Sequence, residues 1–209
     1  MTNSNPSPQV QDTFTKKQAI RQQAHANRKN QPDKDRVSSE IVQRFMRLPE
    51  YAFAETVMFY VDVRDEVRTR QALPEALAGR KRIVIPYCVD GELELFHLEA
   101  MEELEVGMYK ILEPKVDLRQ VPAKRLDAKD LDLIMVPGVA FDANGGRTGH
   151  GKGYYDKLLE HARIDAPLIA LAFDCQIFPE IPCETHDVYM DKVVTESAIY
   201  QGRGRSQTS

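Results

Sequence analysis

Residues 131–156 read LDLIMVPGVAFDANGGRTGHGKGYYD, and this stretch contains the clearest fold signal in the chain. It opens on an apolar run over 131–136, interrupted only by Asp132, that ends at Pro137-Gly138, which is typical of an interior strand. It closes on a predicted helix over 154–163, whose apolar face holds Tyr155, Leu158, Leu159 and Ala162. A buried strand that leads through a glycine-rich loop into a helix is the repeating unit of α/β proteins.

The same alternation extends outward in both directions. Strands are predicted over 56–61, 82–86, 93–98, 168–173 and 192–195, and helices over 13–29, 33–48 and 67–79. We expect Asp33 to cap the second of these helices and residues 101–129 to be irregular. The elements predict an α/β fold, a single three-layer α/β/α domain with a largely parallel central sheet over residues 13–202. The polar segments 1–12 and 203–209 are expected to form flexible tails.

The composition is that of a soluble globular protein, with 42% hydrophobic and 29% charged residues among 209. The net charge of -4 disfavours a general nucleic-acid binder, and no apolar run approaches the roughly 18 residues of a membrane span. The first residues lack a secretory leader pattern, and Cys88, Cys175 and Cys183 form no CxxC pair. We therefore expect a cytoplasmic protein with reduced thiols and with no nucleic-acid or membrane partner.

The loop before the last predicted helix has the composition of an anion site. Five of the 11 glycines lie between Gly145 and Gly153, together with Arg147, His150 and Lys152. Glycines let the backbone approach a ligand and point consecutive N–H groups at it, and the cations add positive potential. Because ligands of α/β sheets bind at the carboxyl ends of the strands, the loop is interpreted as a polyphosphate cradle.

Standard phosphate motifs fit this loop only in part. Residues 146–152 satisfy GxxxxGK, but Gly153 stands where a P-loop has the Ser or Thr that binds Mg2+. The glycines at 149, 151 and 153 are spaced as GxGxG, which differs from the GxGxxG of dinucleotide folds. A mobile glycine-rich loop with solvated cations remains the alternative.

The order of residues in this region resembles one known family. Residues 137–142, Gly146-Arg147, Gly149 and 151–156 are similar to the signature of the 5-formyltetrahydrofolate cyclo-ligase family, also called methenyltetrahydrofolate synthetases. Three further segments agree in type and order, namely Lys17 to Arg21, Asp65-Glu66, and residues 171–173 leading to Asp187. The resemblance covers about residues 13–196; Thr148 and His150 depart modestly from it.

The resemblance implies a ligase that closes a folate ring at the expense of ATP with Mg2+ as cofactor. It implies a monomer whose partners are the small molecules ATP and 5-formyltetrahydrofolate. The ATP-binding residues implied are Lys17, Gln18, Ala19, Ile20, Arg21, Arg147, Thr148, Gly149, His150, Gly151, Lys152, Gly153, Tyr154 and Tyr155. Lys152, Arg147 and Tyr154 are implied as catalytic, with Lys152 as the charge partner of the transferred phosphoryl group.

The resemblance also implies a folate side and a metal site. The folate-binding residues implied are Val61, Glu66, His150, Gly151, Lys152, Gly153 and Tyr154. A carboxylate such as Glu66 suits a reduced pterin, which presents adjacent N–H donors. Asp156 and Asp187 are implied as Mg2+ ligands, and Asp191 is the alternative to Asp187.

Several of these residues also have an interpretation without a role in catalysis or binding. Lys17, Arg21, His25 and Arg28 recur at helical spacing, which is equally typical of a solvated helix face. Glu66 could simply occupy the first turn of the helix expected from residue 67. For the whole chain, the alternatives are an isomerase or acyl-transferase acting on a phosphorylated metabolite, and a non-catalytic nucleotide- or folate-binding protein.

Overall fold

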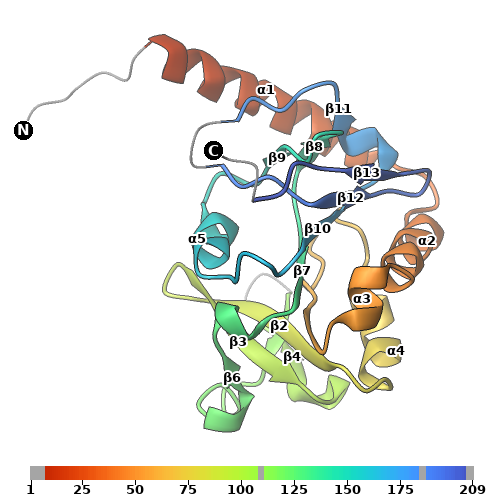
Figure 1. The fold of residues 1–209 in the computed structure, drawn as a ribbon, viewed down its shortest axis with the longest axis vertical. Coiled ribbons are helices and arrows are strands. Elements are labelled where there is room, and N and C mark those ends of the chain that lie inside the picture. The colour runs from red at the N-terminus through yellow and green to blue at the C-terminus, as the bar shows by residue number, and fades with distance from the viewer. Residues whose placement is uncertain (1–7, 108–110, 184–186, 206–209) are drawn as a thin grey trace, which may run out of the picture.

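The computed structural model describes residues 8–107, 111–183 and 187–205, which form a central eight-stranded sheet (Figure 1). Its strands, in spatial order, are β13 (Ile199–Gln201), β12 (Lys192–Val194), β10 (Leu168–Leu171), β7 (Leu133–Val136), β1 (Thr56–Met58), β2 (Arg82–Val89), β3 (Glu92–Leu98) and β6 (Arg125–Leu126). Strands β12, β10, β7, β1 and β2 run parallel. At the edges, β13 pairs antiparallel with β12, β3 pairs antiparallel with β2, and β6 pairs antiparallel with β3. The predicted α/β fold with a largely parallel sheet is confirmed.

Helices cover both faces of this sheet. They are α2 (Lys34–Met46), α3 (Pro49–Phe53), α4 (Leu73–Leu77) and α5 (Tyr154–Glu160), whereas α1 (Pro8–Lys29) lies across one end of the sheet. On one face, Ile41 and Phe45 of α2 share a core with Ile169 of β10. On the other face, Leu159 of α5 packs with Ala170 of the same strand. Successive strand residues point to opposite faces, so one apolar strand joins the two cores and the three layers.

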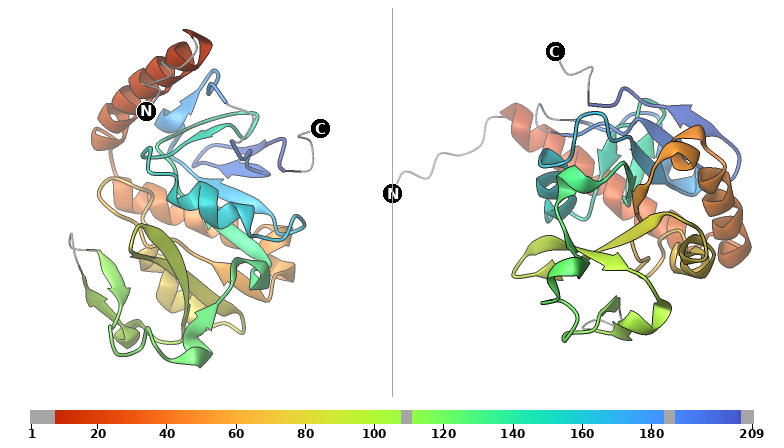
Figure 2. Two further views of the ribbon diagram at one scale, coloured as in Figure 1. Left: turned by 90° about the vertical axis from the view of Figure 1, so that its left-hand side faces the viewer. Right: turned by 60° about the horizontal axis from the view of Figure 1, so that its bottom comes forward.

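Helix α1 lies across the end of the sheet where β7 and β10 finish. It packs on β8 (Ala140–Asp142), which follows β7, and on a 3-10 turn (Asp174–Gln176) that follows β10. Figures 1 and 2 show α1, in red, along this end of the molecule. The amide of Asn27 donates a hydrogen bond to the carbonyl of Cys175 at 2.9 Å, which fixes the last turns of the helix there. Within the described part of the chain, no helix has the length and hydropathy needed to cross a membrane.

A small second sheet separates β7 from α5. Strand β8 pairs antiparallel with β9 (Arg147–Thr148) and parallel with β11 (Ile177–Phe178). The turn between β8 and β9 is organised by the buried carboxylate of Asp142. Its Oδ1 accepts from the amides of Asn144 and Gly146, both at 2.9 Å, and its Oδ2 accepts from the amide of Ile181 at 2.8 Å. This one carboxylate therefore holds the hairpin from which the glycine loop leaves.

The helix predicted over 67–79 is wrong for most of its length. A 3-10 turn (Arg70–Ala72) precedes the five-residue α4, in which Pro74 occupies the first turn. Proline lacks an amide hydrogen and is tolerated at a helix start, so α4 can begin just before it. Residues 67–69 instead follow an irregular path, along which the Thr69 hydroxyl donates to the carbonyl of Tyr60.

Other boundaries differ from those expected. Asp33 stands at the cap position of α2 but makes no capping hydrogen bond with its side chain, since its backbone is left-handed with φ 46°. β1 is shorter than predicted, and β2 extends to Val89. The segment 101–129 contains the short strands β4 (Leu104–Val106), β5 (Leu112–Pro114) and β6. These strands are too short for their sequence to show a period.

The predicted tails are shorter than expected. α1 already begins at Pro8, so residues 8–12 are helical. Residues 203–205 are fixed on the body of the protein, because the amide of Arg203 donates to Asn144 and that of Gly204 donates to Met190. The rest of both predicted tails, 1–7 and 206–209, lies outside the described residues.

Replacing Asp142 with alanine should destabilise the protein strongly. The change leaves three backbone amides without their acceptor, and a buried unpaired donor costs about 1–3 kcal/mol. We expect a urea titration to show a loss of about 3 kcal/mol or more in the free energy of unfolding. The exposed Asp117→Ala variant serves as the control and should change it little. A loss below about 1 kcal/mol for Asp142→Ala would show that the turn does not depend on this carboxylate.

Candidate active site

The cationic face of α1 is turned inward, toward the glycine loop. Lys17 is only 9% exposed, and its Nζ forms an ion pair with Oδ2 of Asp187 at 2.6 Å. One turn further along, Nε of Arg21 donates to the carbonyl of Gly149 at 2.8 Å. At the end of the helix, Arg28 is 1% exposed. The interpretation of this face as a solvated surface is therefore wrong for Lys17 and Arg28.

Gln18 and Ala19, which lie between the two cations that face the site, are exposed. Ile20 packs against a small apolar cluster that includes Ile181, and with Ala19 it lines a separate cavity of about 430 Å³. The structure thus brings Lys17 and Arg21, but not the side chains of these three residues, to the expected site.

The glycine loop has the backbone geometry of an anion cradle. Gly151 and Gly153 have φ values of 84° and 70°, the left-handed region in which a side chain is strained, so both positions favour glycine. In the described part of the chain, no group accepts a hydrogen bond from the amides of residues 149–153. Five consecutive N–H groups are therefore left available, and such groups bind phosphate oxygens well.

Arg147 flanks the loop from the side of the sheet. It is 8% exposed, its Nη1 donates to the carbonyl of Pro137 at 3.2 Å, and its Nη2 forms an ion pair with the carboxylate of Asp156. Its Nε and the hydroxyl oxygen of Thr148 are buried without a partner among the described residues. Buried polar atoms are usually paired, so this side of the loop has unused hydrogen-bonding capacity.

Each expected metal ligand is held by an expected phosphate-binding cation. Asp187 pairs with Lys17, and Asp156 pairs with Arg147. Lys17 and Arg21 lie one turn apart on α1, so Asp187 and Gly149 meet the same stretch of that helix. The site therefore contains two ion pairs beside the loop, in each of which a cation and a carboxylate neutralise each other.

The two carboxylates fit Mg2+. No cluster of three or more His, Cys, Asp or Glu side chains suited to a metal is found among the described residues. Mg2+ needs no such cluster, since it is commonly bound by one or two carboxylates together with substrate phosphates and water. Asp191 does not fit this role, because its Oδ2 accepts from the amide of Leu168 at 2.7 Å and links two strands of the sheet.

Lys152 and His150 lie on the outer side of the loop. Lys152 is exposed, its Nζ lies 5.5 Å from the centroid of the Tyr154 ring, and no described carboxylate forms an ion pair with it. The ring of His150 lies 5.6 Å from that of His25 on α1. Partial burial and the nearby guanidinium group of Arg28 lower the pKa of His150 to about 4, so this ring is neutral at physiological pH.

Glu66 lies buried at the other side of the site. It is 6% exposed, and its Oε2 accepts from the amide of Val63 at 3.0 Å. Burial raises the pKa of Glu66 to about 7, whereas the Val63 amide and the charge of Arg28 oppose that rise. The alternative role in a helical first turn is wrong, because residues 67–69 are not helical. Val61 is half-buried on the same segment after β1.

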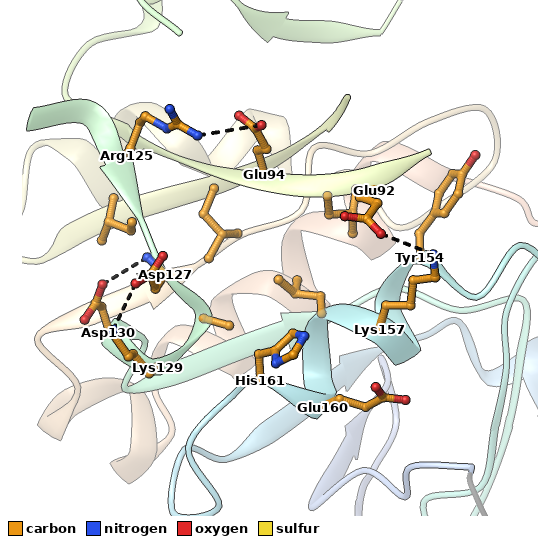
Figure 3. A pocket seen from close by; sticks show the side chains of 15 residues that line it. Glu92, Glu94, Arg125, Asp127, Lys129, Asp130, Tyr154, Lys157, Glu160 and His161 are labelled. Atoms are coloured by element: carbon orange, nitrogen blue, oxygen red, sulfur yellow. Dashed lines mark hydrogen bonds and ion pairs between the residues drawn. The ribbon is translucent and has the colours of Figure 1, made fainter. Parts of the chain in front are cut away.

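A larger cavity of about 900 Å³ lies between β3, β6 and α5 (Figure 3). Of the predicted site residues it contains only Tyr154, whose side chain stands beside Glu92 and Lys157 at one end. Its charged groups largely pair with each other, as Lys157 does with Glu92 at 3.3 Å and Arg125 with Glu94 at 3.8 Å. Tyr154 is therefore placed between this cavity and the glycine loop.

Comparisons with known proteins identify the family. The model of the 5-formyltetrahydrofolate cyclo-ligase family matches residues 13–196. The chain belongs to this family. It is 33% identical over 179 residues to the probable 5-formyltetrahydrofolate cyclo-ligase of Schizosaccharomyces pombe, covering 79% of this chain and 86% of the relative. It is 30% identical over 169 residues to the 5-formyltetrahydrofolate cyclo-ligase of Escherichia coli, covering 79% and 91%.

A solved structure of a cyclo-ligase relative confirms the fold. The NMR structure of the 5,10-methenyltetrahydrofolate synthetase of Aquifex aeolicus superposes with a TM-score of 0.78 at 32% identity. It covers 90% of this chain and 94% of the relative. As a member of the cyclo-ligase family, the protein is a ligase.

Sequence reasoning missed two groups that organise the site. Asp142 was part of the quoted signature, but its role in the turn was not predicted, although the Asp-Ala-Asn-Gly-Gly composition is typical of a turn. Arg28 was recognised only as one of four cations on a helix face. It is buried beside Gly138, which follows β7 and is 110 positions away in the sequence, so no local pattern reveals its burial.

The ion pair between Lys17 and Asp187 should couple the two residues measurably without any ligand. Their side chains are 11% and 17% exposed, so the attraction is only weakly screened. We expect a double-mutant cycle with Lys17→Met and Asp187→Asn to give a coupling free energy on the order of 1–2 kcal/mol in unfolding experiments.

The matched control for this cycle is the pair Arg36–Glu40 on α2. It has the same distance of 2.6 Å, but its side chains are 62% and 51% exposed. Its coupling should be much smaller and should vanish in high salt. Equal coupling in both pairs would contradict the idea that burial sets the strength of the first.

Proposed function

We propose that the protein converts 5-formyltetrahydrofolate into 5,10-methenyltetrahydrofolate with consumption of ATP and Mg2+ and release of ADP and phosphate. The observation that carries this proposal is the row of five available amides over 149–153, flanked by Arg21, Arg147 and Lys152. Family membership narrows the substrate, since the relatives are described as cyclo-ligases of this folate.

The reaction needs two bond changes. The N5-formyl oxygen of the folate attacks the γ-phosphorus of ATP, and ADP leaves. N10 then attacks the activated carbon and loses its proton, and the C–O bond to the phosphoryl group breaks as phosphate leaves. Both nucleophiles belong to the substrate, so catalysis rests on positioning and charge neutralisation.

The residues around the loop suit these tasks. The amides of 149–153 receive phosphate oxygens, Lys152 neutralises the transferred group, and Arg147, Lys17 and Arg21 hold the polyphosphate from two sides. Asp156 and Asp187 hold Mg2+, which supplies charge neutralisation at the phosphate oxygens. As ATP draws the cations toward its phosphates, each of these carboxylates is released from its ion pair.

On the folate side, Glu66 accepts hydrogen bonds from adjacent pterin N–H groups, and Val61 lines the same pocket. Tyr154 packs beside the formyl group. His150, Gly151 and Gly153 border both substrates. We further propose that the protein acts as a cytoplasmic monomer with residues 13–202 as its domain; the free thiols of Cys88, Cys175 and Cys183 suit a reducing compartment.

The direct test of this function is a turnover assay with purified protein, ATP, Mg2+ and 5-formyltetrahydrofolate. Methenyltetrahydrofolate absorbs in the near ultraviolet, where the formyl substrate does not, so the product is followed directly. We expect absorbance to grow only when both ATP and Mg2+ are present. ATP binding without turnover would favour a non-catalytic binding protein, and turnover of a phosphorylated metabolite without ATP would favour an isomerase or acyl-transferase.

Lys152→Ala should abolish most of the turnover while leaving the fold intact. The loss of one preorganised electrostatic donor typically lowers the rate by roughly 100- to 1000-fold. The control is Lys157→Ala, which removes an exposed lysine of α5 that pairs with Glu92. Turnover of Lys152→Ala within about threefold of the unchanged protein would remove this residue from the phosphoryl-transfer step.

Glu66→Gln should weaken folate binding and leave ATP binding nearly unchanged. The amide keeps the size of the side chain but replaces one acceptor oxygen with a donor, which opposes a pterin N–H. The expected loss is on the order of 2–3 kcal/mol in the binding free energy of folate, measured by calorimetry. Equal weakening of both ligands would indicate a folding defect, and loss of ATP binding alone would overturn the assignment of the two sides.

A further inference from the structure

Arg28 is a buried cation without a counter-ion in the described part of the chain. Its Nη1 donates to the carbonyl of Gly138 at 3.2 Å, and its Nη2 donates to Nδ1 of His25 at 3.3 Å. Its Nε is buried without a partner among the described residues, and no described carboxylate lies within ion-pair distance. Arg28 is 1% exposed, so its charge is only weakly screened by water.

Burying a guanidinium group without a carboxylate partner costs folding free energy, so a functional role for Arg28 would explain its presence. The position of Arg28 indicates such a role. Gly138 follows β7, and Glu66 follows β1, the strand next to β7 in the sheet. Arg28 therefore lies at the same end of the sheet as Glu66, and its charge favours the ionised form of that carboxyl group.

The charged and titratable groups around Glu66 come from three elements. Arg28 belongs to α1; Tyr60, Asp62 and Arg64 belong to the segment after β1; and Tyr155 belongs to α5. Asp62 opposes ionisation of Glu66, whereas Arg64 and Arg28 favour it. Of these two cations, Arg28 is buried and lowers the pKa of Glu66 more than Arg64 does.

We propose that Arg28 is a positioning residue of the folate site, whose buried charge keeps Glu66 in its hydrogen-bond-accepting form while its hydrogen bond fixes the Gly138 carbonyl. The proposal rests on the proposed function, in which the Glu66 carboxylate accepts from pterin N–H groups. Arg28 does not touch the substrate and acts through Glu66.

The pH dependence follows with a definite sign. With a pKa of about 7, Glu66 becomes the acceptor as pH rises through neutrality, so folate affinity rises over the same range. Removal of the Arg28 charge moves that rise to higher pH. If the midpoint moves by about 1 unit, affinity at pH 7 falls roughly fivefold and recovers by about pH 9. Burial lowers the pKa of His25, and it lowers the pKa of His150 to about 4, so the His150 ring titrates below this window.

The experiment measures the dissociation constant of 5-formyltetrahydrofolate by calorimetry between about pH 6 and pH 9, without ATP. Arg28→Met and Arg28→Gln remove the charge, and Arg28→Gln keeps a donor for Gly138 in case Arg28→Met does not fold. Arg28→Lys restores the charge and should keep the midpoint near that of the unchanged protein. Lys29→Met removes the neighbouring exposed cation of α1 and should also leave the midpoint in place.

A loss of affinity that is equal at every pH in both neutral variants would overturn the proposal, because it indicates a purely structural role. A second measurement separates this outcome from failure of the proposed function. Carbon-13 NMR of labelled glutamate carboxyl groups gives the Glu66 midpoint in the protein without folate, with its signal identified by its absence in Glu66→Gln. If Arg28→Gln leaves that midpoint unchanged, the Arg28 proposal fails. If the midpoint rises but Glu66→Gln binds folate normally, the pterin assignment fails instead.

Discussion

The contact between the cationic face of α1 and the glycine loop is the interaction on which the site depends. The hydrogen bond from Arg21 to the carbonyl of Gly149 joins residues 128 positions apart, and it lies one helical turn from the Lys17–Asp187 ion pair. The other end of α1 is fixed at the carboxyl ends of β7 and β10 by Asn27 and Arg28. A helix near the start of the chain thereby completes a site whose loop comes from the middle of the sheet.

The charges of this site are arranged in balanced pairs. Without ligands, Lys17 and Arg147 are neutralised by Asp187 and Asp156. In the proposed reaction, a polyphosphate alone would separate each cation from its carboxylate, and Mg2+ alone would leave the cations without partners. The two ligands together would provide a new partner for every group. In our account the site therefore favours joint binding of ATP and Mg2+, and the cost of opening the ion pairs is offset only when both are present.

The sequence predicted the elements with a long or continuous pattern. The apolar run over 131–136 and the glycine loop identified the strand, the end of the sheet and the candidate phosphate site. Of the helix predicted over 67–79, only Leu73–Leu77 is α-helical, because Pro74 starts this short helix late and because Tyr60 and Asp62 accept hydrogen bonds from Thr69 and Arg70 before it. Strands β8 and β9 are three and two residues long, too short to show a period, yet they set where the loop begins.

The roles proposed for individual side chains come from the family resemblance, and the contacts between them were not predicted. Pairing of Lys17 with Asp187 brings together residues 170 positions apart, and nothing in the local sequence indicates it. Burial of Arg28 likewise depends on how α1 lies across β7. Such contacts arise when elements that are distant in the sequence pack together, and the periodicity of a single helix or strand does not predict that packing.

In the proposed reaction, the amides of residues 149–153 bind the polyphosphate of ATP. Hydrogen exchange at these amides, measured with Mg2+ and either a non-hydrolysable ATP analogue or AMP, tests it most directly. Because no group among the described residues accepts from them, the amides should exchange quickly without ligand, and the ATP analogue should slow them strongly. AMP, which lacks the β- and γ-phosphates, should leave their exchange nearly unchanged. Exchange that the ATP analogue does not slow, or that AMP slows equally, would contradict the account.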